Sequence, residues 1–598
     1  MPVYLAIARM TQETTKTKFE FQLLGRIVGL AKPYKGLFAG TLLLSVILAP
    51  VSMLRPFLVS IMVDDYILRN DLNGLYRMAG VFVIVVLLTV LLRYFMIFYS
   101  VLLGQNVIRD LRTRVFDHIT SLQLRYFDQT PIGKVTTRTI NDVETINTVF
   151  TQGIISMVAD LLGIFAVIGI MLYTSWKLTL LVLVTMPILL FATYIFKEKV
   201  KVAFEKVRAQ LSNMNAFLQE RITGMHIIQI FNAEEQEMCK FKKINRDYTQ
   251  ANLDAITYYA IFFPVVEMIN YLALAILVYF GATYVIRDTV SLGALLAFPW
   301  YVTLLFSPIR WLADKFNTLQ MGMVAAERVF LELDRREQIT DNGYLRPDRL
   351  EGKVEFDHVD FSYDGNQVIL KDVSFKLDEG KTLAIVGSTG SGKTTIINVL
   401  ARFYETMNGT VRVDGEDIKK YRLSHLRGRM AVVLQDVFLF HGSVMDNITL
   451  RDPNISEQKV FESAAAIGAD RFIEALSNGY DHVVTERGSN LSMGQRQLIS
   501  FVRALVFDPD ILILDEATSS IDTETEAVIQ YAIEKLIDRR SSIIIAHRLS
   551  TIRNADHIMV MDKGEIREFG PHEELVQIPD GRYRELYDMQ FAKEEVLV

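Results

Sequence analysis

The sequence has almost no cysteine, the residue whose disulfide bonds stabilise many small secreted proteins. Its 598 residues include one cysteine, Cys239, together with 14 prolines and 3 tryptophans. A single cysteine excludes an internal disulfide framework and carries no metal motif, so we interpret Cys239 as a small filler residue. Charge of one sign is also not in large excess. The net charge of -6 is modest and argues against a nucleic-acid partner.

A cleavable secretion signal is not expected either, because Met1 to Lys18 is polar and has no short apolar run. What the sequence has in abundance is hydrophobic residues, at 51%, with a mean hydropathy of +0.24. Nearly all the long apolar runs lie before residue 315. The length suggests two to four domains, and the change in composition places the main boundary there.

Six apolar segments are each near the ~20 residues that cross a bilayer. We expect them at about 37–62, 79–103, 150–174, 178–196, 258–285 and 291–313. Two connections, 104–149 and 197–257, are long and rich in lysine and arginine, which places them in the cytoplasm together with both termini. Ahead of the first span, the amphipathic stretch Phe21 to Ala31 is either an interfacial helix or an ordinary surface helix.

The long connections are expected to be helices that continue beyond the bilayer, since apolar residues recur at helical spacing from Val107 to Leu122. Each then needs a turn at its far end. Phe127–Gly133, with proline and glycine as helix breakers, supplies the first, and Ile222–Asn232 supplies the second. We call these two turns the elbows, and they are where force from a second domain would enter.

A few polar residues lie within or near the expected spans: Arg93, Asp160, Glu267, Asn270 and Arg310. Charged side chains in a membrane usually face protein or a water-filled cavity. Glu267, which follows Pro264 closely, is the strongest candidate for lining a substrate path. An ion pair or a position near the interface is the alternative for each residue.

The clearest motif is Gly387-Ser-Thr-Gly-Ser-Gly-Lys-Thr394. A strand-like run, Thr382–Val386, precedes it, and a helical start, Thr395–Leu400, follows it. The pattern predicts a loop whose backbone N–H groups surround phosphate oxygens, with Lys393 on the β- and γ-phosphates and Thr394 on Mg²⁺. The predicted nucleotide contacts are Gly387, Ser388, Thr389, Gly390, Ser391, Gly392, Lys393, Thr394 and Thr395.

A second nucleotide motif is Ile511-Leu-Ile-Leu-Asp-Glu516. Four apolar residues predict a buried parallel strand, which would bring Asp515 to Mg²⁺ directly or through water. Glu516 would then polarise a water for attack on the γ-phosphate. The domain is expected to open at Val354 with a strand ending near Tyr363, which either stacks on an adenine or is a plain strand aromatic.

Leu491-Ser-Met-Gly-Gln495 lies shortly before that strand and resembles the signature sequence of the ATP-binding cassette (ABC) family. The order of motifs is similar to that family over residues 354–575, and the six spans resemble an exporter half-transporter. The resemblance implies a multidomain membrane protein, with a six-helix all-α transmembrane domain and an α/β P-loop domain. We expect a tail and interfacial helix (1–35), the transmembrane domain (36–320), a linker (321–353) and the nucleotide-binding domain (354–598).

The resemblance also implies roles for single residues. Tyr363 would stack on adenine, Glu516 would be the catalytic base, and His547 would be the switch histidine at the γ-phosphate. Thr394, Gln435 and Asp515 would hold Mg²⁺, the last through water. The remaining implied nucleotide or cassette contacts are Ser492, Met493, Gly494, Gln495 and Asp522.

Cassettes of this family work as head-to-tail pairs, so the resemblance implies a second half-transporter. The family's usual signature has glycine where this chain has Met493, while Lys393, Asp515, Glu516 and His547 are intact. We therefore favour a heterodimer whose partner supplies an intact signature to this chain's catalytic residues. A homodimer that tolerates methionine is the alternative.

The function expected from the resemblance is ATP-driven efflux of hydrophobic or amphipathic compounds, with ATP and Mg²⁺ bound and membrane lipid as surroundings. A lipid flippase, or a regulatory or channel-like member, is the alternative. A bacterial inner membrane is expected, with both termini and the nucleotide-binding domain in the cytoplasm.

Overall fold

The computed structural model describes residues 21–339, 341–515, 523–545 and 552–595. The chain divides into two compact units. The helical unit comprises residues 1–120 and 131–335, and the α/β unit comprises residues 121–130 and 336–598. The short segment 121–130 therefore belongs with the α/β unit, although both of its neighbours in sequence belong to the helical unit.

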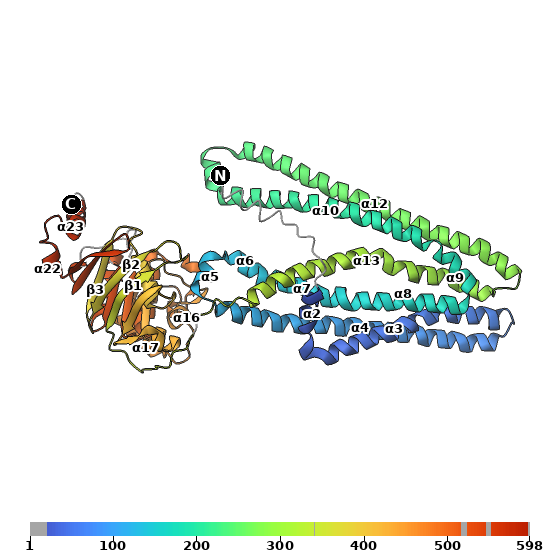
Figure 1. Cartoon of the computed structure of the whole chain (residues 1–598), viewed down its shortest axis with the longest axis horizontal. Helices are drawn as coiled ribbons and strands as arrows, with labels where there is room; N and C mark the ends of the chain where they lie inside the picture. Colours follow the sequence, from blue (N-terminus) through green and yellow to red (C-terminus); the bar gives the residue numbers. More distant parts are fainter. Residues whose placement is uncertain (1–20, 340, 516–522, 546–551, 596–598) are drawn as a thin grey trace. The chain divides into compact units, whose positions relative to one another are not determined.

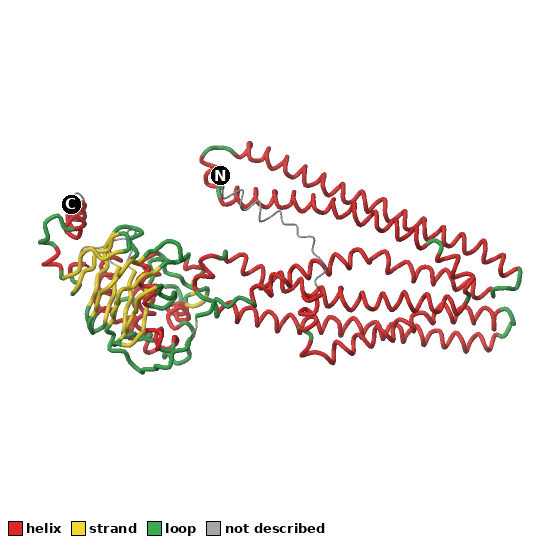
Figure 2. Tube along the Cα trace, viewed as in Figure 1, coloured by secondary structure: helices red, strands yellow, loops and turns green. Residues whose placement is uncertain are grey.

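Long helices form the helical unit (Figures 1 and 2). The described helices are α2 (Phe21–Gly29), α3 (Lys35–Ile61), α4 (Leu72–Thr120), α6 (Ile132–Thr137), α7 (Val143–Thr148), α8 (Ile155–Thr174), α9 (Trp176–Leu183), α10 (Met186–Thr223), α11 (Met225–Ile230), α12 (Glu234–Ile286) and α13 (Leu292–Leu333). Three π-helical turns, η2 (Met62–Ile67), η3 (Arg138–Asp142) and η4 (Val149–Ile154), join helices of this unit.

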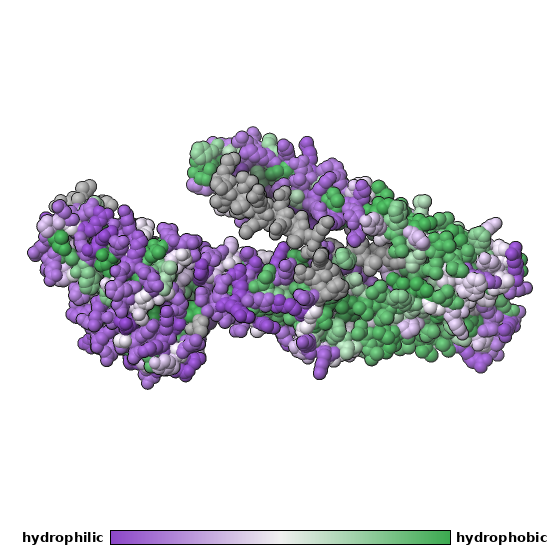
Figure 3. Space-filling view, viewed as in Figure 1, coloured by the Kyte–Doolittle hydropathy of each residue, from purple (hydrophilic) through white to green (hydrophobic). Residues whose placement is uncertain are grey.

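The expected membrane domain is confirmed. Five helical stretches are long and apolar enough to cross a membrane, and α13 adds a shorter apolar part, Leu292–Pro308. Large side chains such as Ile84, Leu87 and Val90 on α4 are exposed on this unit. Figure 3 shows a broad hydrophobic surface over these helices. Such a continuous apolar surface is what lipid contact requires.

The helices continue past the expected spans, as predicted: α4 ends at Thr120, and α10 at Thr223. The fourth segment differs from the expectation, because it breaks between α9 and α10 at Val184 and Thr185. Pro187 explains the break, since its ring would clash with the carbonyl of Leu183, where α9 ends. The span is therefore built from two helices rather than one.

The N-terminal helix α2 is anchored on the end of α13. Arg26 donates two hydrogen bonds of 2.8 Å to Asp334 and lies 4.2 Å from the Phe330 ring centroid. The next residue of α2, Ile27, is fully buried. A second charged contact on α13 is the ion pair of Glu332 with Arg138. The contacts of Arg26 attach the expected interfacial helix to α13.

Two sheets form most of the α/β unit. The antiparallel sheet has the order β2-β1-β4-β5, and the larger sheet has the order β12-β11-β3-β10-β9-β6. In the larger sheet every neighbouring pair is parallel except β11 and β12. The strands are β1 (Val354–Phe361), β2 (Leu370–Leu377), β3 (Thr382–Gly387), β4 (Asn408–Val413), β5 (Glu416–Asp417), β6 (Met430–Val433), β9 (Ile511–Asp515), β10 (Ser541–Ile545), β11 (His557–Asp562) and β12 (Glu565–Gly570), with a separate pair β7 (Gly442–Ser443) and β8 (Val483–Val484).

The parallel strands are buried on both faces, as their unbroken apolar runs predict. In β9, Ile511 and Ile513 pack in one core with the antiparallel sheet, while Leu512 and Leu514 pack in the other core with helices. The helices of this unit are α5 (Leu124–Gln129), α14 (Lys393–Leu400), α15 (Leu423–Gly428), α16 (Val444–Thr449), α17 (Glu457–Ala466), α18 (Asp470–Glu474), α19 (Met493–Val506), α20 (Thr523–Ile537), α22 (His572–Leu575) and α23 (Arg582–Glu595). This α/β architecture confirms the predicted fold class.

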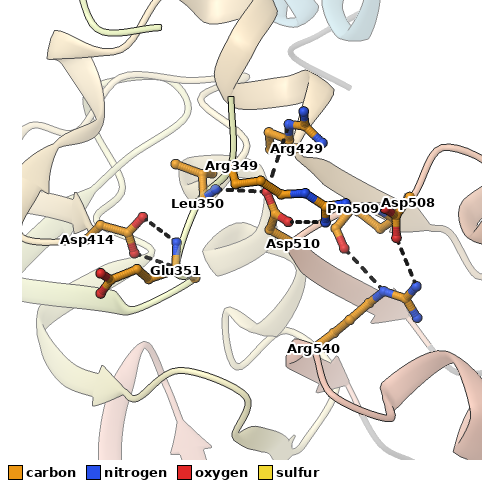
Figure 4. A network of polar contacts seen from close by, with 10 residues as sticks. Arg349, Leu350, Glu351, Asp414, Arg429, Asp508, Pro509, Asp510 and Arg540 are labelled. Carbon is orange, nitrogen blue, oxygen red and sulfur yellow. Dashed lines mark hydrogen bonds and ion pairs between the residues drawn. The ribbon is translucent and has the colours of Figure 1, made fainter. Parts of the chain in front are cut away.

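A polar network fixes the entry of the chain into the sheets (Figure 4). Arg349 donates to Asp508 (2.7 Å) and Asp510 (3.0 Å), just ahead of β9. Asp414 accepts three backbone N–H bonds of 2.9 Å from residues 351–353. Arg540, ahead of β10, donates to Asp508 as well. The network therefore ties together the starts of β9 and β10, which are neighbours in the larger sheet.

Candidate functional site

The 387–395 loop connects β3 to α14 and depends on glycine. Gly387 has φ +150°, and a Cβ there would lie 2.2 Å from the carbonyl oxygen of Met561. Gly392 has φ +105° and occupies the N-cap of α14. Positive φ at these two positions costs little only for glycine. The loop thus wraps the N-terminal end of the helix, where backbone N–H groups attract anions.

Lys393 is buried within this loop, at 8% exposure. Its Nζ donates to the carbonyl oxygens of Gly387 (2.8 Å) and Ser388 (3.0 Å). Burial lowers the pKa of Lys393, while the nearby Asp515 carboxylate raises it. A buried ammonium group of this kind gains strongly from a negatively charged ligand.

Two more features of the loop fit a phosphate chain with a divalent cation. Ser391 is 2% exposed, and its Oγ makes no hydrogen bond to any described residue. Thr394 is exposed in the first turn of α14 and can offer its hydroxyl as a ligand. Within the described ranges no group of three or more His, Cys, Asp or Glu could hold a metal. A cation here would therefore have few protein ligands, such as the Thr394 hydroxyl and the Asp515 carboxylate, together with water and phosphate oxygens, which is typical of Mg²⁺.

The parallel sheet brings the other predicted residues to the same edge. β10 pairs with both β3 and β9, and β9 pairs with β6, so all four strands end on one side of the sheet. Asp515 ends β9, with Ile545 as its partner on β10. Gln435 follows β6 and is exposed. Carboxyl ends of parallel strands are where such folds place ligand contacts.

Three predicted residues lie outside the described part of the chain: Glu516, Asp522 and His547. In sequence, Glu516 directly follows β9 and His547 follows β10 closely. Their assigned roles remain predictions.

Tyr363 is brought beside the same loop from the antiparallel sheet. Its hydroxyl donates to Thr395 Oγ1 (3.2 Å) and accepts from Asn398 Nδ2 (3.1 Å), both on α14. Its ring is edge-on to those of Phe361 (4.8 Å between centroids) and Tyr404 (5.0 Å). The structure therefore places Tyr363 next to the loop, and its stacking on a base stays a prediction.

The signature segment, residues 491–495, begins α19. The Ser492 hydroxyl accepts from Gln495 N (3.2 Å), and the Gln495 side chain accepts from Ser492 N (3.0 Å), which forms a capping box. Met493 is half-buried, is the first residue of α19, and is not among the described residues with positive φ. Only the bulk of methionine, not its backbone conformation, therefore distinguishes this segment from the glycine version.

The two sequence motifs are not bonded to each other in the single chain. Among the residues that the structure describes, no hydrogen bond or ion pair joins 491–495 to 387–395. The 387–395 loop contains the buried Lys393 and the Ser391 hydroxyl, which has no hydrogen-bond partner among the described residues. The 491–495 segment instead contains the capping box of Ser492 and Gln495.

The polar residues of the spans differ in their contacts. Asp160 on α8 is paired with Lys315 on α13. Arg93 on α4 and Glu267 on α12 are exposed and form no hydrogen bond or ion pair with another described residue. The side chain of Arg310 lies outside the described part. Glu267 thus meets one condition for a substrate-path residue, exposure on a membrane helix.

Three residues at the site were missed in the sequence analysis. Asn398 and Tyr404 contact Tyr363, and Gly564 N donates to the Ser391 carbonyl (3.1 Å). Tyr404 carries a weak signal, as a tyrosine shortly after the P-loop helix. Asn398 and Gly564 carry none, because only the folded sheets bring them to the loop.

Known proteins share both units. The description "ABC transporter transmembrane region" matches residues 38–309, and "ABC transporter" matches residues 370–519. An uncharacterized ABC transporter ATP-binding protein, YknV of Bacillus subtilis, is 38% identical over 97% of both chains. A probable multidrug resistance ABC transporter, YheH of the same species, is 39% identical over 81% of this chain and 72% of its own length. An ATP-dependent lipid A-core flippase of Syntrophus aciditrophicus is 32% identical over 96% of this chain and 95% of its own. This chain therefore belongs to the ABC transporter family, as a multi-pass membrane half-transporter of the exporter type that couples ATP hydrolysis to transport.

Proposed function

We propose that the chain exports hydrophobic or amphipathic compounds as one half of a two-chain ABC exporter. The observation that carries the proposal is the phosphate-binding loop with buried Lys393 and Asp515 at one sheet edge, in a chain that also contains the membrane helices. The names of two relatives, a multidrug resistance transporter and a lipid A-core flippase, support substrates of this chemical class.

In the proposed reaction, Lys393 binds the β- and γ-phosphates and the loop N–H groups orient them. Mg²⁺, when bound, would neutralise phosphate charge and polarise the leaving group, with Thr394, Gln435 and Asp515 as its holders. Glu516 removes a proton from the attacking water, and His547 holds the γ-phosphate end in place. Tyr363 binds the adenine by stacking.

A second chain completes each nucleotide site in this proposal. The signature segment of one cassette, with Ser492 and Gln495, covers the ATP held by the other, and Asp522 lies at the contact. We favour a heterodimer, because Met493 adds bulk where close approach to a phosphate is needed. A partner with glycine at this position would complete the site that contains Glu516.

Closure of the cassettes reaches the membrane helices through the two elbows. The first elbow overlaps the end of α5, which is part of the α/β unit. The second elbow contains α11 and exposes Ile227, Ile230 and Phe231. We propose that this apolar helix docks on a cassette, because an exposed apolar patch of this kind favours a protein contact.

The transport test uses inside-out vesicles that contain the reconstituted complex. Two probes, a lipophilic fluorescent dye and a fluorescent phospholipid, are followed with ATP and with Glu516→Gln as the inactive control. ATP-dependent movement of the dye supports the drug-exporter proposal, and movement of the phospholipid alone supports the flippase alternative. If ATP is hydrolysed and neither probe moves, the exporter proposal is contradicted in favour of a regulatory or channel-like role.

Glu267 is tested in the same vesicles. Replacement by glutamine keeps the size of the side chain and removes its charge. If Glu267 lines the substrate path, transport of a cationic dye falls more than transport of a neutral dye, while the ATPase rate without substrate is unchanged. Equal transport of both dyes by the variant would remove Glu267 from the path.

A further inference from the structure

The helix α5 is tethered to the α/β unit at its beginning. Leu122 and Gln338 form an isolated β-bridge, and Gln123 N donates to the Glu337 carbonyl (3.0 Å). Gln338 Nε2 donates to Ser121 Oγ (2.6 Å). The segment before α5 is thus paired with the segment that leads from α13 into the α/β unit.

A side-chain hydrogen bond tethers the other end of α5. The hydroxyl of Tyr404 donates to the carboxylate of Asp128. Tyr404 is 8% exposed, so its hydroxyl reaches out from the core to an exposed acidic residue. Burial, followed by this hydrogen bond, raises the pKa of Tyr404. Hydrogen bonds to a charged acceptor are stronger than neutral ones.

Tyr404 also contacts the residue that the sequence assigns to the nucleobase. Its ring is edge-on to Tyr363, with 5.0 Å between centroids and an interplanar angle of 87°. Both rings lie against Phe361. The Tyr363 hydroxyl is in turn held by Thr395 on α14. One continuous set of contacts therefore runs from the phosphate-binding helix through Tyr363 and Tyr404 to α5.

We propose that Tyr363, Tyr404 and Asp128 form a relay that reports a bound nucleobase to α5. This inference rests on the proposed nucleotide site, and it gives the base a role besides affinity. A base stacked on Tyr363 restricts the Tyr363 ring, which fixes the Tyr404 ring against it. The Tyr404 hydroxyl is then held toward Asp128, and α5 is ordered on the cassette. Tyr404 and Asp128 are positioning residues in this proposal, because neither touches the phosphates.

The relay is separable from packing, because Tyr404→Phe removes the hydroxyl and keeps the ring. A matched control exists in Tyr421, which is 4% exposed and whose hydroxyl donates to the Val413 carbonyl (2.9 Å). Tyr421→Phe also removes one buried hydroxyl from the same core, but that hydroxyl bonds to β4 rather than to α5. Asp128→Asn keeps an oxygen acceptor, whereas Asp128→Ala does not.

The experiment is hydrogen–deuterium exchange on the full-length protein in lipid nanodiscs, with and without ATP and vanadate. Two peptides are compared: one covering 121–130 and one covering 387–395. We expect ATP to slow exchange in both peptides of the wild type and of Tyr421→Phe. In Tyr404→Phe and Asp128→Ala, the slowing in 121–130 should fall by about tenfold, as expected for one hydrogen bond to a charged group. The slowing in 387–395 should remain, and Asp128→Asn should recover part of the effect in 121–130.

A second arm replaces ATP by UTP, whose smaller base stacks less well. The relay predicts that UTP protects 387–395 but protects 121–130 less than ATP does. Equal protection of 121–130 by ATP in wild type and Tyr404→Phe would overturn the relay. The same loss in Tyr421→Phe would overturn it too, since the effect would then be general loosening. Absence of protection in 387–395 of the wild type would instead contradict the proposed nucleotide site itself.

Discussion

The 387–395 loop and the 491–495 segment belong to one α/β unit, yet they are built in opposite ways. The loop encloses a buried cation, Lys393, and leaves the Ser391 hydroxyl without a bond to any described residue. The signature segment satisfies its own polar groups through the Ser492–Gln495 capping box. The loop therefore has polar groups that a ligand can bind. The polar groups of the signature segment are instead already hydrogen-bonded at the start of α19. In the proposed two-chain assembly, one chain would therefore supply two unlike halves of a nucleotide site.

The largest expected effect is on the ATPase rate, from a change in the half of the site that contains the 387–395 loop. Glu516→Gln should lower the ATPase rate by about 10³-fold, because the base that removes the water proton is lost. ATP binding should remain, since the amide keeps the size of the side chain. The check is steady-state phosphate release together with equilibrium binding of ATP. Hydrolysis at the wild-type rate in this variant would contradict the assignment of Glu516.

Lys393→Ala should affect binding as well as turnover. Loss of the charge-assisted bonds to phosphate is expected to weaken ATP binding by roughly tenfold to a hundredfold. Titration of ATP by isothermal calorimetry measures this change. Lys381→Ala serves as a control, because Lys381 is a surface lysine of the same strand region paired with Asp556. An equal loss in both variants would show that the effect is not specific to the loop.

Met493→Gly distinguishes the two modes of pairing. If the chain acts alone as a homodimer, the smaller residue should raise its ATPase rate by roughly fivefold, because the bulk against the opposite phosphate is removed. In the favoured heterodimer, Met493 faces the weaker site, and the change should stay under about twofold. Phosphate release measured with and without the partner separates these outcomes. A fivefold rise within the heterodimer would contradict the proposed division of labour.

The smallest effect is expected at the helix cap. Ser492→Ala removes the acceptor for Gln495 N and should lower the free energy of unfolding by about 1 kcal/mol. Ser492→Thr retains an acceptor and should recover most of that loss. Thermal unfolding of the purified protein measures both variants. An unchanged melting temperature in Ser492→Ala would mean that the capping box does not hold α19.

The strands and helices that carry the motifs were predictable because local patterns specify them. The apolar runs before Lys393 and before Asp515 predict buried parallel strands. The glycines between the first of these runs and Lys393 predict the phosphate-binding loop. The break at Val184 was not foreseen, although Pro187 signals it, because the apolar run continues through the proline. Contacts from distant segments carry no local signal: Asn398 and Tyr404 reach Tyr363 only after the two sheets pack. The same holds for Asp128, which precedes Tyr404 by a long stretch of sequence.

The most direct test of the account is the ATPase rate of the reconstituted chain, measured alone and then with candidate partner half-transporters. Each preparation is compared with its Glu516→Gln counterpart. The account predicts low activity of the chain alone and a large increase with a partner whose signature contains glycine, abolished by Glu516→Gln. Full activity of the chain alone would contradict the heterodimer, and activity that persists in Glu516→Gln would contradict the proposed catalytic site.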